Sequence, residues 1–210
     1  MLKRLMAAIK EQDLWALFLR LSTAGVGAQL LALAVYPLIS RLYGPEDFGI
    51  RATFAALFML ILPFSTLNLE FALPLVKERS EAGQVFKTSF LLTTALAFLL
   101  LIIVGVFYFG AWVAHPVIPF LWLLPIAIFL GGLRKVILGW ASWLAHQRAL
   151  VHSKYWRAGT KSLMELIGGW WQANIWFLVS SQVVGILAML VYLYGQMRSD
   201  LHQIFRDLRN

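Results

Sequence analysis

The sequence predicts an all-α integral membrane protein, a bundle of six transmembrane helices with both termini in the cytoplasm. Of its 210 residues, 60% are hydrophobic and only 13% are charged, whereas a soluble domain carries about 25% charged residues. Its apolar stretches run for about 20 residues, the length of one helical crossing, without the alternation of a membrane β-barrel. Basic residues gather in alternate loops, as they do on the cytoplasmic side of a membrane.

Six apolar stretches define the expected spans, which are residues 21–43, 51–74, 90–110, 117–136, 155–172 and 175–194. The fifth stretch is the weakest because Lys161, Glu165 and Gln172 interrupt it. The charge distribution favours keeping it, since without this span the basic residues near the C-terminus would lie outside.

Two flanking segments complete the predicted organisation. Apolar residues recur at helical spacing within residues 1–19, which indicates an amphipathic helix lying on the membrane surface. Residues 20–196 form the six-helix transmembrane lobe, and residues 197–210 form a basic cytoplasmic tail.

The composition also excludes several classes of function. The chain has no cysteine, and its four histidines are scattered, so we expect no metal site. It contains neither a phosphate-binding loop nor a nucleophile elbow, so we expect no enzyme and no cofactor. The net charge of +8 is explained by membrane topology, and nothing in the chain resembles a nucleic-acid-binding module.

The stretch "RLYGPEDFGI", residues 41–50, is a polar interruption between two apolar runs. Gly44 is suited to end a helix and Pro45 to begin the next one. The acidic residues that follow lie where a helix dipole favours negative charge. We therefore predict a hairpin tip on the outer side, in which Arg41 and Arg51 balance the two acids, and no binding site.

This hairpin also brings opposite charges into register. Counted outward equally from the turn, Arg20 comes opposite Glu70, and we predict a structural ion pair between them near the cytoplasmic end. A charge inside a membrane needs such a partner because burying it alone is costly. The sequence leaves open whether the pair only makes the charges tolerable or also takes part in transport.

A polar stripe follows the fifth predicted span. Arg157, Lys161, Glu165, Gly168 and Gln172 recur at steps of three or four residues, which places them on one helix face. Lys161 and Glu165 can pair at this spacing, and Glu165 is expected near the bilayer midplane. The stripe predicts either the lining of a water-filled cavity with a basic inner mouth or a packing seam that the glycines tighten.

Three segments of the sequence resemble a known protein family. "AQLLALAVYPLISRLYGPEDFGI", "LPFSTLNLEFALPLVK" and "ERSEAGQVFKTS" resemble the opening helices of bacterial polysaccharide-biosynthesis flippases. These are the Wzx-like flippases of lipid-linked oligosaccharides, in the superfamily that also contains multidrug exporters. The likeness is strong over about residues 23–90 and looser in "ILGWASWLAHQRALVHSKYWRAG" and "SSQVVGILAMLVYLY".

The resemblance implies that the protein moves a polyprenyl-pyrophosphate-linked oligosaccharide across the bacterial inner membrane, for surface polysaccharides such as lipopolysaccharide O-antigen. Such proteins use alternating access, often coupled to a Na⁺ or H⁺ gradient. By their positions, Arg20, Arg157 and Lys161 are the candidates for the pyrophosphate, Gln29 and Gln172 for sugars. Glu165 joins them in the predicted cavity.

The family has two six-helix lobes, and the chain has room for one. The second lobe is expected from another copy or from a separate chain, and the partners are membrane lipids, the lipid-linked oligosaccharide and the polysaccharide polymerase machinery. Two alternatives remain open. One is a lobe that exports small cations, which would favour unpaired Glu70 and Glu165. The other is a scaffold subunit of a polysaccharide assembly complex that transports nothing.

Overall fold

The structure, a computed structural model, describes residues 26–27, 29–30, 32–76, 78–109, 116–144 and 147–207. Every regular element within these residues is helical, which confirms the predicted all-α class. An apolar helix, Ala32–Leu42, covers the second half of the first predicted span. The predicted surface helix at residues 1–19 and the candidate Arg20 lie outside the described residues.

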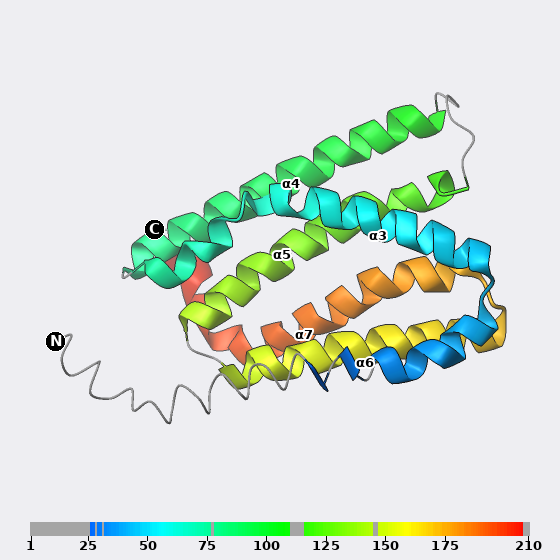
Figure 1. Cartoon of the computed structure of the whole chain (residues 1–210). Coiled ribbons are helices and arrows are strands. Elements are labelled where there is room, and N and C mark those ends of the chain that lie inside the picture. The colour runs from blue at the N-terminus through cyan, green and yellow to red at the C-terminus, as the bar shows by residue number, and fades with distance from the viewer. Residues whose placement is uncertain are drawn as a thin grey trace.

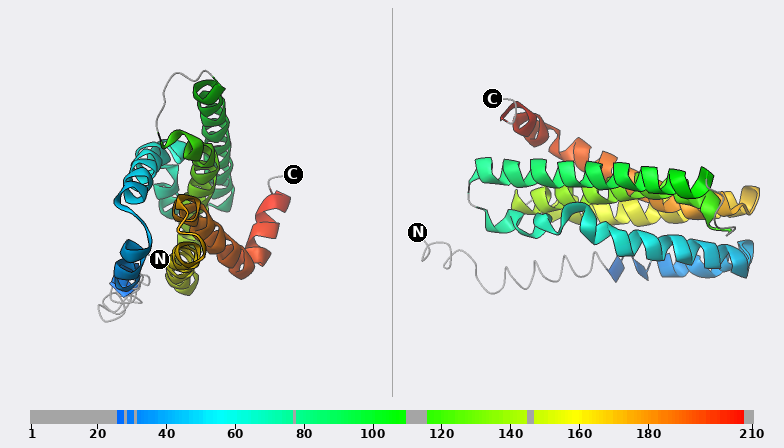
Figure 2. Two further views of the ribbon diagram at one scale, coloured as in Figure 1. Left: turned by 90° about the vertical axis from the view of Figure 1, so that its right-hand side faces the viewer. Right: turned by 90° about the horizontal axis from the view of Figure 1, so that it is seen from above.

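The helices form an up-and-down bundle in which each long helix runs antiparallel to the next (Figure 1). After Ala32–Leu42 the described elements are α3 (Pro45–Thr66), η1 (Leu69–Phe71), η2 (Leu73–Leu75), α4 (Arg79–Phe109), η3 (Ile118–Trp122), α5 (Leu123–Trp143), α6 (Gln147–Trp171) and α7 (Ile175–Asp207). Helix α5 is central, since it contacts α3, α4, α6 and α7. The helix Ala32–Leu42 lies along α6, as two further views show (Figure 2).

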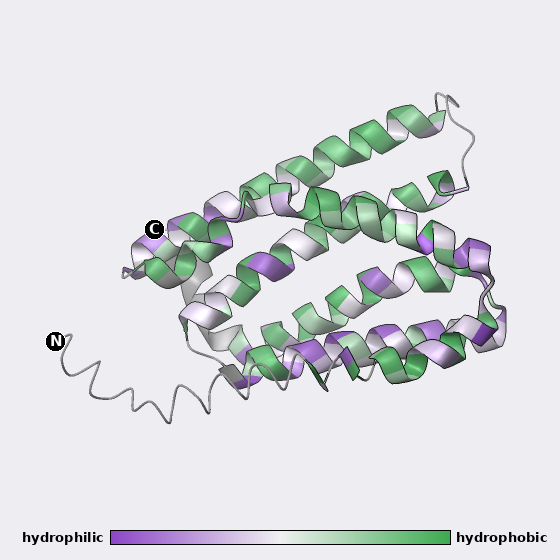
Figure 3. Cartoon of the chain, viewed as in Figure 1, coloured by the Kyte–Doolittle hydropathy of each residue, from purple (hydrophilic) through white to green (hydrophobic). Residues whose placement is uncertain are grey.

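Four of the described helices are long and apolar enough to cross a membrane. Their apolar segments are Pro45–Thr66, Ser80–Phe109, Ile118–Trp143 and Ile175–Met197. Helix α4 is hydrophobic along most of its length, whereas polar residues are spread along α6 (Figure 3). The exposed side chains of α4 include Phe98, Ile102 and Phe109, as expected of a helix that faces lipid. The chain therefore has the features of a multi-pass membrane protein.

The ends of several helices differ from the ends of the predicted spans by six residues or more. The second predicted span, 51–74, begins at Pro45 and ends at Thr66. The third and fifth begin earlier than expected, at Arg79 and Gln147. The sixth, 175–194, agrees closely with the apolar segment Ile175–Met197. Its helix continues to Asp207, through a break at Met197 (φ −114°, ψ 15°) where the predicted tail begins. Polar ends that the hydropathy pattern excluded continue as helix, because intrahelical hydrogen bonds do not depend on side-chain polarity.

The predicted hairpin tip is confirmed at the level of the backbone. The helix before it ends at Leu42, Gly44 has an extended backbone, and Pro45 starts α3 with two acidic residues in its first turn. The backbone N–H of Gly44 donates a hydrogen bond of 3.0 Å to Oδ2 of Asp47. The carboxylate of Asp47 thus satisfies an amide that the helix itself leaves without a partner.

Replacing Asp47 by alanine is expected to lower the free energy of unfolding by about 1 kcal/mol, because it removes this hydrogen bond and a charge that the helix dipole favours. The measurement is thermal unfolding of the full chain in detergent micelles. Glu46→Ala is the matched control, since Glu46 is exposed in the same turn and loses only the charge. Equal shifts for the two variants would contradict a role for the hydrogen bond.

Helix α3 ends abruptly inside the bundle. Leu67 and Asn68 both have a left-handed backbone, with φ of 49° and 58°, and the chain continues as two short 3-10 turns. A left-handed backbone cannot continue a right-handed helix, which is why α3 stops at Thr66, before the predicted end of the span at residue 74. The break turns the carboxylate of Glu70 back toward the hydroxyl of Thr66, at 2.6 Å.

The apolar core gathers around α5. Trp140, Ile128 and Val136 of α5 are almost completely buried and belong to one cluster with Phe54 of α3 and Ile186 of α7. Because α5 is enclosed by neighbours on most sides, its polar residues face protein and not lipid. This placement allows two adjacent basic residues of α5 to lie within the bundle.

Candidate functional site

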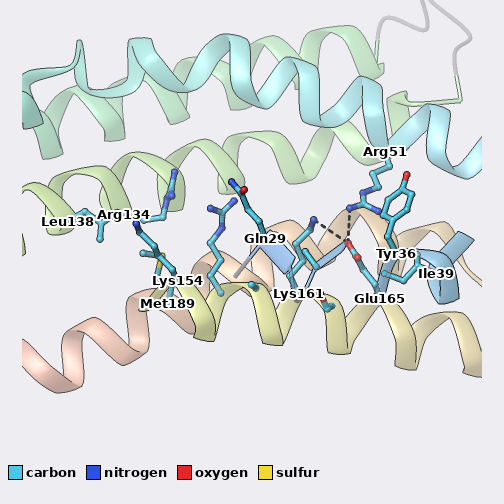
Figure 4. A pocket seen from close by; sticks show the side chains of 14 residues that line it. Gln29, Tyr36, Ile39, Arg51, Arg134, Leu138, Lys154, Lys161, Glu165 and Met189 are labelled. Atoms are coloured by element: carbon cyan, nitrogen blue, oxygen red, sulfur yellow. Dashed lines mark ion pairs between the residues drawn. The ribbon is translucent and has the colours of Figure 1, made fainter. Parts of the chain in front are cut away.

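A pocket of about 440 Å³ lies among the helix Ala32–Leu42 with Gln29 before it, α3, α5, α6 and α7 (Figure 4). Its charged lining residues are Arg51, Arg134, Lys154, Arg157, Lys161 and Glu165. Five basic side chains and one carboxylate leave a net four positive charges. Basic groups held close together in a partly desolvated space attract anions strongly.

Helix α6 supplies four of these six charged side chains, spaced three or four residues apart as one helix face requires. A different face of α6 exposes Trp156, Leu163 and Ile167. Helix α7 packs closely on α6 because Gly185 lies against it: a Cβ at Gly185 would be 3.1 Å from the carbonyl oxygen of Arg157 and from Cβ of Lys161. This packing sets the rotation of α6 about its axis.

The pocket has two different ends. At the end that we call the Glu165 end, Oε1 of Glu165 lies 3.2 Å from Nη2 of Arg51 and 3.5 Å from Nζ of Lys161. The same oxygen accepts a 2.8 Å hydrogen bond from the hydroxyl of Ser181. The Glu165 side chain is only 3% exposed, so this carboxylate links α3, α6 and α7 at a buried point.

At the other end, which we call the Arg134 end, the basic side chains of Arg134, Lys154 and Arg157 line the pocket. Among the described residues, no carboxylate forms an ion pair with any of the three. Nε of Arg134 is buried and has no hydrogen-bond partner in the described part of the chain. The Arg134 end therefore offers unpaired hydrogen-bond donors to an anion.

A second buried ion pair lies outside this pocket, at the break after α3. Nζ of Lys135 on α5 is 2.6 Å from Oε1 of Glu70, and it also donates to Oδ1 of Asn68 at 2.9 Å and to Oγ1 of Thr66 at 3.2 Å. Three oxygen atoms thus surround one ammonium group. Adjacent residues of a helix point about 100° apart, so Arg134 and Lys135 serve two separate sites.

The structure brings together four of the predicted cavity residues, since Gln29, Arg157, Lys161 and Glu165 all line the pocket. The predicted pairing of Lys161 with Glu165 is confirmed. Gln172 does not line the pocket, because it lies just beyond the end of α6 and is exposed. The predicted stripe therefore divides, with charged residues at the pocket and Gly168 packed against Phe177.

Two further predictions stay open. Helix α6 begins at Gln147, so Glu165 lies about 27 Å from its start and about 9 Å from its end. The predicted place of Glu165 near the bilayer midplane stays a prediction. The predicted pair of Arg20 with Glu70 also stays a prediction, because Arg20 lies outside the described residues. Among the described residues, Glu70 pairs with Lys135.

Sequence reasoning missed three basic residues of the pocket. The sequence pattern places Arg51 at the hairpin tip, Arg134 at the inner end of the fourth predicted span, 117–136, and Lys154 just before the fifth. A signal for Arg51 was present, because Pro45 at the first helical position places Arg51 almost two turns inside α3. A charge at that depth needs a partner on another helix. Arg134 lies two residues before the predicted end of its span at Val136, where a basic side chain is expected to reach the cytoplasmic interface. Helix α5 instead runs on to Trp143, which places Arg134 within the bundle.

The fold and the site together define a class: an all-helical protein of membrane type that encloses a basic pocket within its bundle. Comparison with family models, with curated proteins and with solved structures finds no match. The family resemblance of the quoted segments therefore remains an expectation from the sequence.

Proposed function

We propose that this chain forms one lobe of a flippase that moves a polyprenyl-pyrophosphate-linked oligosaccharide across the inner membrane of a bacterium. The lobe comprises six membrane-crossing helices with both termini in the cytoplasm, and α6 is the fifth crossing. Its 25 residues extend about 37 Å, enough for the hydrocarbon core. The exposed apolar face of α6 meets lipid, and its charged face meets the pocket.

The observation that carries this proposal is the basic pocket inside the bundle. In the predicted orientation the Arg134 end of the pocket faces the cytoplasm, where a lipid-linked oligosaccharide is made before it is moved. Arginine and lysine hold phosphate oxygens through charge-assisted hydrogen bonds, which are stronger in a water-poor environment. Arg134, Lys154 and Arg157 would hold the pyrophosphate, and Gln29 supplies an amide for a sugar hydroxyl.

The structure gives the cation-exporter alternative less support. That function favours free carboxylates in the cavity, but Glu165 is paired with Arg51 and Lys161, and Glu70 is paired with Lys135. A pocket with four net positive charges repels an organic cation. Nothing in the described residues specifically favours a scaffold that transports nothing.

The test is binding of farnesyl pyrophosphate to the full chain in detergent micelles, measured by calorimetry, with farnesol as the uncharged comparison. We expect binding of the pyrophosphate only. Arg157→Gln should weaken it about tenfold or more, since a hydrogen bond to a charged group contributes about 1.5–3 kcal/mol. Arg148→Gln is the matched control, because Arg148 is exposed on α6 and does not line the pocket.

Leaflet exchange of a fluorescent polyprenyl pyrophosphate in liposomes then tests movement. It is measured with one copy of the chain per vesicle and with several copies per vesicle, because the second lobe is expected from another copy. Equal affinity of the Arg157 and Arg148 variants would contradict the proposed site. Binding of tetraphenylphosphonium that disappears in Glu165→Gln would instead indicate cation export. A folded chain that binds neither ligand would favour the scaffold.

A further inference from the structure

The Glu165 end of the pocket has the composition of an anion-binding site that is already filled. Arg51 and Lys161 converge there on a single carboxylate oxygen, Oε1 of Glu165. The hydroxyl of Ser181 donates to the same atom. Such an arrangement, with an arginine, a lysine and a hydroxyl around one oxygen, is how proteins bind carboxylates and phosphates of ligands.

Arg51 is only partly used by this contact. Its Nη2 faces Glu165, while its Nη1 is buried and has no hydrogen-bond acceptor among the described residues. A guanidinium has a planar fork of donors that fits two oxygens of one oxyanion at once. A buried donor without an acceptor costs free energy, so an oxyanion with two suitably placed oxygens would satisfy Arg51 better than Glu165 does.

The two ends of the pocket are too far apart for one phosphate group. Arg157 and Glu165 are two turns apart on α6, which corresponds to about 12 Å along the helix axis. The arginines at the Arg134 end, which pair with no carboxylate among the described residues, and Arg51 at the Glu165 end therefore form separate positions (Figure 4). Figure 4 shows Lys161 between them.

We propose that Arg51 and Lys161 form a second oxyanion site, in which the carboxylate of Glu165 is an intramolecular occupant that an anionic group of the ligand displaces. This inference rests on the proposed function and adds a second position to it. Glu165 neutralises the two cations while the site is empty of ligand. Because the ligand must compete with a tethered carboxylate, the site binds it weakly enough to release it.

The test is calorimetric titration of the full chain in detergent micelles with inorganic pyrophosphate, and in a parallel arm with glucuronate. Glu165→Gln removes the competing charge and is expected to tighten binding about tenfold, the effect of one charge-assisted contact. Adding Arg51→Gln to this variant should abolish the gain. Glu81→Gln, at an exposed position in the first turn of α4, makes the same change in net charge outside the pocket and should leave binding unchanged.

The two arms identify the anionic group. If Glu165→Gln tightens the binding of pyrophosphate, the second site holds the phosphate part of the ligand. If it tightens the binding of glucuronate alone, the second site holds an acidic sugar. Ser181→Ala is a milder variant that loosens Glu165 without removing it, so a smaller gain of about twofold to threefold is expected. It keeps the proposal testable if Glu165→Gln does not fold.

Binding to Glu165→Gln or Ser181→Ala that is equal to or weaker than that of the unaltered chain would overturn the second site. If Arg157→Gln still weakens binding in that case, the proposed function stands without it. If the unaltered chain binds neither pyrophosphate nor farnesyl pyrophosphate, the proposed function and the second site are both overturned.

Discussion

Replacing Lys135 by methionine is expected to lower the free energy of unfolding by about 3–5 kcal/mol, the usual cost of breaking a buried ion pair on one side. The Glu70 residue is only 6% exposed. Without Nζ of Lys135 at 2.6 Å, its carboxylate would keep, among the described residues, the hydrogen bond from Thr66 alone. A buried charge with so little compensation is strongly unfavourable. Thermal unfolding of the full chain in detergent micelles measures the effect.

A second substitution separates charge from packing. Glu70→Gln in the Lys135→Met background removes the unpaired charge, so the double variant should recover much of the lost stability. The recovered free energy of unfolding is measured as the coupling energy of a double-mutant cycle. Lys87→Met makes the same chemical change at an exposed position of α4, and we expect it to shift stability by less than about 0.5 kcal/mol. If Lys135→Met behaved like Lys87→Met, the ion pair would not stabilise the bundle.

Replacing Gly168 by alanine is expected to destabilise the protein by about 1–3 kcal/mol, because the added Cβ would overlap with Phe177 where α6 and α7 are in close contact. The turn after α6 prevents the helices from moving apart. The carbonyl oxygen of Gly168 accepts hydrogen bonds from the amides of Gln172 and Ala173, at 3.2 and 3.1 Å, and Ala173 has a left-handed backbone with φ of 48°.

Gly159→Ala is the matched control on the same helix. A Cβ at Gly159 meets nothing within 4 Å, so only helix propensity changes, and we expect a gain of up to about 1 kcal/mol. Opposite signs of the two shifts in melting temperature would confirm the packing explanation. Equal shifts for the two variants would contradict close packing at Gly168.

Local pattern was enough to predict a large part of the fold. Continuous apolar runs and the low share of charged residues predicted a helical membrane protein, since a hydrophobic span of this length has few other solutions. Gly44 and Pro45 predicted where one helix ends and the next begins. Pro45 acts through its own fixed φ, whereas Gly44 has an extended backbone that any residue can adopt. The spacing of Lys161 and Glu165 predicted their pairing, since both lie on one helix.

The ends of helices were predicted less well, for different reasons. Helix α3 stops at Thr66 because Leu67 and Asn68 take a left-handed backbone, which neither residue type requires. Helix α5 continues past two adjacent cations because Lys135 finds Glu70 on another segment and Arg134 faces a pocket. Hydropathy alone could not foresee this compensation, because it depends on groups far away in the chain.

The sequence by itself therefore determined the class of protein, the order of its helices, the hairpin tip at Gly44 and the polar face of α6. Only the tertiary structure decided which charges meet: Arg51 with Glu165, and Lys135 with Glu70. The physical reason is geometric. A pair on one helix follows from a spacing of 1.5 Å per residue, whereas a pair between helices depends on their rotation and axial offset. Those are set by close packing at sites such as Gly168 and Gly185.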